Sequence, residues 1–129
     1  MKISGIGLAC LVLAAAWAGG GAGSLVQQAP VKTAKRANPR AGDPEAWRAG
    51  AKLYARECAE CHGAQRQGGV KAPPLTGADV TEGAPGALFW VLRNGSLNRG
   101  MPSFAHLPEP QRWQIVTFLS ETAGAQRRQ

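Results

Sequence analysis

The chain has 129 residues, with 15 basic and 8 acidic side chains and a formal net charge of +7, and this length predicts one small domain. The seven residues that account for the excess positive charge lie near the two ends of the chain: Lys2, Lys32, Lys35, Arg36, Arg40, Arg127 and Arg128. Residues 43–126 carry eight basic and eight acidic side chains, so the predicted folded part is neutral and is not a basic nucleic-acid-binding domain.

The first 18 residues predict an export signal. Met1 and Lys2 precede an apolar run, and Ala16-Trp17-Ala18 has the small-x-small form of a signal-peptidase site. A cleavage point as late as residue 23 is an alternative. An uncleaved anchor is another, because the apolar run approaches the roughly 20 residues that span a bilayer. The expected location is therefore the periplasm, with the protein either soluble or tethered to the membrane.

Residues 24–42 are rich in Ala, Gln, Pro and basic side chains and contain few large apolar residues. Such a composition predicts a disordered basic linker, because it offers too little apolar surface to fold. Membrane contact through residues 1–42 is a further expectation. The folded domain is expected over residues 43–122, followed by a flexible tail at 123–129.

The first predicted helix begins with Asp43 as N-cap and Pro44 at the first helical position, which is a strong start signal. Its apolar face recurs at helical spacing and carries Trp47, Gly50, Ala51, Tyr54 and Cys58. This helix therefore places Cys58 at the end of its apolar face, at the edge of the predicted interior of the domain.

The run Cys58-Ala59-Glu60-Cys61-His62 is typical of covalent haem attachment. The two thiols would each bond one vinyl group as a thioether, and the histidine would bind the iron. The rival interpretations are weaker. A structural zinc site lacks a fourth ligand at short spacing, a thioredoxin-like pair requires a βαβ unit, and a disulfide would close a loop too small to stabilise much.

The second predicted helix runs from Pro85 to Asn94, with Gly95 as the residue that ends it. It supplies bulky apolar side chains, and Trp90 is a candidate wall of the haem pocket. The third helix is expected to begin within residues 108–111 and to continue to about Thr122. Gly- and Pro-rich segments lie between the helices, and no strand is predicted.

Met101 is the candidate second axial ligand of the iron. It lies between Gly100 and Pro102 in a predicted loop, and export would leave it as the single methionine of the mature chain. A thioether suits a haem used for electron transfer, because Met/His ligation raises the reduction potential. His106 is the competing ligand, and it would give a haem with two histidines and a lower potential.

Four features together make the chain resemble the class I c-type cytochromes of bacteria, which carry a single haem, over about Asp43 to Glu121. The features are the Cys58–His62 run, Gly50 with Tyr54, Pro73-Pro74-Leu75, and Gly100-Met101-Pro102-Ser103-Phe104. The resemblance implies a small all-α cytochrome c-like fold, in which three or more helices and Gly/Pro-rich loops wrap around one covalent haem c. It also implies that Ile115 and Phe118 of the last helix pack against the first helix.

The resemblance further implies roles for individual residues. The carbonyl of Pro73 or Pro74 would accept the Nδ1 hydrogen of His62 and fix the ring. Arg93 or Arg99 would reach the haem propionates. His62 and Met101 would be the axial iron ligands.

A haem closed by two protein ligands has no open position for a substrate, so the expected reaction is outer-sphere electron transfer and not enzymatic catalysis. The resemblance implies a one-electron carrier of a respiratory chain, acting between a periplasmic donor such as a dehydrogenase and an oxidase or reductase. We expect a monomer or a subunit of a complex. The alternative is a ligand sensor or peroxidase, which requires an open sixth position and thus Met101 away from the iron.

Overall fold

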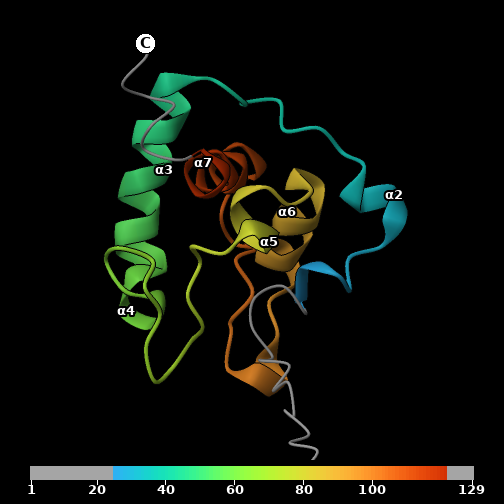
Figure 1. Cartoon of the computed structure of the whole chain (residues 1–129). Coiled ribbons are helices and arrows are strands. Elements are labelled where there is room, and N and C mark those ends of the chain that lie inside the picture. The colour runs from blue at the N-terminus through green and yellow to red at the C-terminus, as the bar shows by residue number, and fades with distance from the viewer. Residues whose placement is uncertain (1–24, 122–129) are drawn as a thin grey trace, which may run out of the picture.

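The computed structural model describes residues 25–121, and this part is helical (Figure 1). Its elements are α2 (Val31–Ala34), α3 (Pro44–Glu57), α4 (Ala59–His62), α5 (Ala78–Thr81), α6 (Pro85–Asn94), the 3₁₀ helix η1 (Leu97–Arg99) and α7 (Glu109–Ser120). Residues 25–121 contain no β-strand, and a single isolated bridge pairs Ser96 with Met101. The all-α prediction is confirmed.

The predicted export signal at 1–18 and the predicted tail at 123–129 lie outside the described residues. Within 25–121, no helix has the length and apolar composition needed to cross a bilayer.

Helix α3 begins where the sequence predicts it. The Asp43 carboxylate accepts hydrogen bonds from the backbone N–H groups of Glu45 and Ala46, at 2.9 and 3.2 Å, and Pro44 occupies the first turn. These bonds satisfy amides that have no partner inside the helix. The bounds of α6 agree with the prediction, and α7 ends two residues before the predicted Thr122.

Helices α3 and α7 cross in close contact. A Cβ atom on Gly50 would lie 2.0 Å from the backbone oxygen of Gln114, so only glycine permits this approach. The rings of Trp47 and Tyr54 pack beside this point on Phe118, with centroids 5.3 and 5.2 Å apart. The predicted pairing of the first helix with Phe118 is therefore present.

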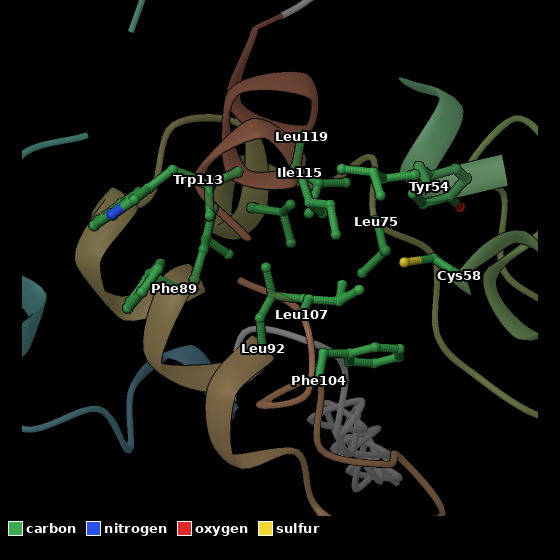
Figure 2. Close-up of a cluster of buried hydrophobic side chains, with 14 residues drawn as sticks. Tyr54, Cys58, Leu75, Phe89, Leu92, Phe104, Leu107, Trp113, Ile115 and Leu119 are labelled. Atoms are coloured by element: carbon green, nitrogen blue, oxygen red, sulfur yellow. The ribbon is translucent and has the colours of Figure 1, made fainter. Parts of the chain in front are cut away.

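A buried apolar cluster fills the space below this crossing (Figure 2). Phe89 of α6 stacks on Trp113 of α7 at 4.1 Å, and Ile115 and Val116 of α7 are fully buried. The cluster extends to Cys58, whose sulfur points toward its interior in Figure 2. The core therefore reaches the attachment motif itself.

Residues 25–42, which we call the N-terminal strap, overlap the predicted basic linker and lie along the helices of the domain. The strap contains α2, which packs on α6, and its later part passes over α7 toward the start of α3 (Figure 1). Asn38 Nδ2 donates to Thr117 Oγ1 at 2.8 Å, and the N–H of Gly42 donates to Glu121 Oε1 at 2.7 Å. Composition does not indicate these contacts, because most of them use polar groups and the backbone rather than large apolar side chains.

Candidate haem-binding site

A cavity of about 430 Å³ opens between the attachment motif and the loop that carries Met101, which is within the usual size of a cofactor pocket. Its apolar lining consists mainly of Leu75, Val80, Leu88, Val91, Leu92, Phe104 and Leu119. Val80 comes from α5, Leu88, Val91 and Leu92 from α6, and Leu119 from α7. The cavity is therefore a continuation of the apolar core.

Three residues of the attachment motif form one wall of this cavity: Cys58, Cys61 and His62. Helix α3 ends at Glu57, and the single turn of α4 follows, with the N–H of His62 donating to the Cys58 carbonyl at 3.0 Å. This turn explains the spacing of the motif, because residues three and four apart lie on one side of a helical turn. Both cysteines are free thiols.

The Cys58 thiol is held in its protonated form. Burial, and secondarily the neighbouring Glu57 and Cys61, raises the pKa of the Cys58 thiol to about 12. Reactive cysteines have lowered pKa values and electropositive surroundings, so Cys58 does not resemble a redox-active thiolate.

His62 is oriented by the predicted proline loop. Its Nδ1 lies 2.8 Å from the carbonyl oxygen of Pro73. A carbonyl can only accept, so Nδ1 carries the hydrogen and Nε2 keeps its lone pair for another partner. Of the two candidate prolines, Pro73 makes this contact and lines the cavity, whereas Pro74 is exposed and packs beside Gly68.

The segment around this contact is fixed from several directions. The N–H of Gly68 donates to the His62 carbonyl at 2.7 Å, and the Tyr54 hydroxyl donates to the Gly63 carbonyl at 2.7 Å. Burial, more than the nearby Cys58, raises the pKa of Tyr54 to about 12, an effect that Arg66 opposes. The tyrosine hydroxyl therefore remains a donor over the physiological range.

Met101 lines the cavity, and His106 does not. Met101 is half-buried, lines the cavity and packs against the core cluster. Reciprocal backbone hydrogen bonds of 2.9 and 3.0 Å join it to Ser96. His106 is exposed, its ring 6.0 Å from that of Phe104, and it is not among the lining residues.

The remaining predicted contacts divide into two groups. Arg99 lines the cavity, as a residue that reaches a propionate must. Arg93 is exposed on α6, with its carbonyl accepting from Ser103 Oγ at 2.6 Å, and Trp90 is half-buried. Neither Arg93 nor Trp90 lines the cavity, so the structure does not bring them to the predicted site.

Sequence reasoning missed two kinds of lining residue. Lys71 and Glu60, which pair at 3.5 Å, belong to the rim. Leu25 and Val26 of the N-terminal strap also line the cavity. The signal for the second pair was present, because Leu25-Val26 is an apolar pair in an otherwise polar segment.

The residues around the cavity fit a covalently bound haem. Two thiols, one imidazole with a free Nε2 and one thioether surround an apolar space, which is the ligand set of a cytochrome c. Within residues 25–121, no group of three or more His, Cys, Asp or Glu side chains is placed to hold a metal ion directly.

Comparison with known proteins agrees with this ligand set. Residues 45–119 match the family model described as cytochrome c oxidase, cbb3-type, subunit III, and no curated protein matches the chain. Among solved structures, cytochrome CL from the marine methylotrophic bacterium Methylophaga aminisulfidivorans MPT is similar in fold, with 22% identity and a TM-score of 0.54. That match covers 63% of this chain and 55% of the other. The chain belongs to the family of c-type cytochromes that the matched model describes.

Proposed function

We propose that the protein is an exported single-haem cytochrome c that carries one electron at a time between a periplasmic donor and a downstream acceptor. Membership of a cytochrome c family implies electron transfer in general terms. The observation that supports the finer proposal is that His62, Met101 and both cysteines line one largely apolar cavity. The haem, when bound, supplies reversible one-electron chemistry at its iron.

Each residue of the site then has a distinct task. Cys58 and Cys61 would hold the cofactor covalently, and Pro73 fixes the ring of His62 so that Nε2 would be available to the iron. Met101 would supply the second protein ligand of the iron. The apolar lining excludes water and thereby favours the reduced, less charged state of the cofactor.

The donor is proposed to be a periplasmic dehydrogenase, and the acceptor an oxidase or reductase of a respiratory chain. The description of the matched family names an oxidase subunit, so a place as a subunit of such a complex is included in the proposal. The neutral charge of residues 43–126 favours short-lived complexes without strong long-range steering. Residues 1–42 would provide the export signal and any contact with the membrane.

The alternative function, a sensor or peroxidase with an open sixth position, requires Met101 to lie away from the iron. The position of Met101 in the cavity wall and the exposure of His106 favour the carrier.

The test is an optical spectrum of the haem-loaded protein, oxidised and then reduced, with carbon monoxide added last. We expect c-type bands, a weak thioether-to-iron band in the oxidised form and no response to carbon monoxide. Met101→Ala should abolish the thioether band and admit carbon monoxide, whereas His106→Ala, the matched control, should change neither. A wild-type protein that binds carbon monoxide readily would favour the sensor or peroxidase, and absence of haem bands would refute both functions.

A further inference from the structure

We propose that the N-terminal strap completes the haem pocket, with Leu25 and Val26 as pocket residues and Arg36 as the residue that positions them. The proposal rests on the proposed function in one respect, namely that the cavity holds haem. It concerns a part of the chain that lies outside the family match, which begins at residue 45. The strap therefore lies outside the matched part of the chain.

The first observation is the place of the two apolar residues. Leu25 and Val26 line the same cavity as Cys58 and Met101, and Val26 packs against the buried core cluster. The chain then turns away, with the N–H of Gln28 donating to the Leu25 carbonyl at 3.0 Å. The two side chains therefore form part of the cavity wall, and their removal would open it to water.

The second observation is the close docking of α2 on α6. A Cβ atom on Gly86 would lie 2.1 Å from the Thr33 carbonyl oxygen and 2.9 Å from those of Ala34 and Arg36. Three strap carbonyls thus approach α6 at a point where only glycine leaves room for them. This fit fixes the distance of the strap from the helix that supplies Leu88, Val91 and Leu92 to the cavity.

The third observation is the environment of Arg36. Its guanidinium lies 4.9 Å from the ring centroid of Phe89 and 5.4 Å from that of Trp113, and Nη2 donates to Glu109 Oε1 at 2.8 Å. Both rings are buried and stacked on each other. A guanidinium held by aromatic faces and a carboxylate is oriented as well as attracted. Arg36 therefore ties the strap to α6 and α7 at once.

A second hydrogen bond and a lowered pKa favour the charged form of the Glu109 carboxylate that binds Arg36. It also accepts from Trp113 Nε1 at 3.3 Å, and the hydrogen bond from Arg36, followed by that from Trp113, lowers the pKa of the Glu109 carboxyl. Lys35 and Arg36 are both exposed, but none of the contacts described for residues 25–121 involves the Lys35 side chain. Lys35 and Arg36 carry the same charge, so they differ in the contacts that their side chains make.

A strap in this position has a measurable consequence. Water that reaches the cofactor stabilises its oxidised, more charged state and lowers the reduction potential, because the apolar shell controls dielectric and solvent access. Opening the strap should therefore lower the midpoint potential. The amides of α2 that bond within the strap, including that of Lys35 to the Val31 carbonyl, should at the same time exchange their hydrogens faster.

The test compares Arg36→Ala with Lys35→Ala in the full haem-loaded chain, since each variant removes one positive charge from the same segment. We expect Arg36→Ala to lower the midpoint potential and to speed exchange of the strap amides about tenfold, as expected for the loss of a partly desolvated cation–π contact and an ion pair. Lys35→Ala should change neither quantity. Val26→Ser should lower the potential and leave the exchange of the α2 amides near that of the wild type.

The outcomes separate this inference from the proposed function. If the wild-type chain binds no haem, the proposed function fails. If it binds haem but Arg36→Ala and Val26→Ser keep the wild-type potential, the strap is not part of the pocket, whatever its exchange rate. If Arg36→Ala fails to fold, Arg36→Lys replaces it, because it keeps the charge and loses the planar stacking. The midpoint potential and the exchange of the strap amides of Arg36→Lys then test the proposal in the same way.

Discussion

Helix α7 contacts α3 and the N-terminal strap through two different kinds of interaction. Against α3 it packs so closely at Gly50 that no side-chain atom fits. Against the N-terminal strap it relies on polar and charged groups, among them Glu109 with Arg36 and Thr117 with Asn38. The α3–α7 contact depends on close packing, so one added side-chain atom disrupts all of it. The contact with the strap consists of separate polar interactions, and each can be removed by its own substitution.

The largest expected effect is that of Gly50→Ala. The new methyl group would lie 2.0 Å from the Gln114 oxygen and 3.0 Å from Phe118 Cβ, so the two helices must separate. We expect the free energy of unfolding to fall by about 3 kcal/mol or more, measured by denaturant unfolding of the haem-loaded protein.

Gly69→Ala is the matched control for this change. Its added methyl group would have Cys61 O, at 3.8 Å, as its nearest neighbour, so the loss should stay within about 0.5 kcal/mol. Equal losses in the two variants would mean that the crossing of α3 and α7 is looser than the structure shows.

Gly86→Ala should cost less than Gly50→Ala, although the added atom would lie as close to a backbone oxygen, at 2.1 Å from Thr33. The strap can move off α6 while the core remains intact, so we expect a loss of about 2 kcal/mol. Limited proteolysis should show new cleavage within 25–42. A loss as large as that of Gly50→Ala, without such cleavage, would contradict the distinction between the two contacts.

Tyr54→Phe removes the hydrogen bond from the buried hydroxyl to the Gly63 carbonyl and should cost about 1 kcal/mol. Because burial raises the pKa of Tyr54 from 10.0 to about 12, its contribution is fully present below pH 10 and is lost as the pH rises through 12. The wild type should therefore lose more stability than Tyr54→Phe across this interval in an alkaline unfolding series. Parallel curves would show that Tyr54 does not titrate with folding.

The smallest effect concerns Glu109 in acid. Its pKa is lowered from 4.5 by Arg36 and Trp113, so the stabilisation is present above pH 4.5 and is lost as the pH falls through the lowered value. Protection of the strap amides against exchange, relative to unstructured chain at the same pH, should fall over that range in the wild type. Glu109→Gln should show lower protection already at neutral pH and little further change in acid, and a pH response equal to that of the wild type would exclude Glu109 as the titrating group.

The elements that could be predicted from the sequence are those fixed by interactions between residues close together in the chain. Asp43 and Pro44 start α3, Gly95 ends α6, and the attachment motif needs only one helical turn to bring its residues to one wall. In each case the deciding contact lies within a few residues. These local signals therefore suffice for the main helices and for the centre of the candidate site.

The polar contacts of the strap could not be predicted, because the partner residues lie far away in the chain. Arg36 is separated from Glu109 by 73 positions, and nothing in the sequence near Arg36 indicates a ring on which it packs. The sequence left the choices between Pro73 and Pro74 and between Arg93 and Arg99 open for a related reason. Each depends on which way a side chain or a carbonyl faces, and composition does not encode that direction.

Backbone hydrogen bonds hold the loop that carries Met101 on both sides of the thioether. Ser96 and Met101 exchange two of them, and beyond the methionine the N–H of Phe104 donates to the Leu92 carbonyl at 2.8 Å. These bonds restrict the conformations open to the chain beside the sulfur. Holding the thioether as a ligand therefore costs little additional conformational entropy, so an intrinsically weak ligand can keep its position.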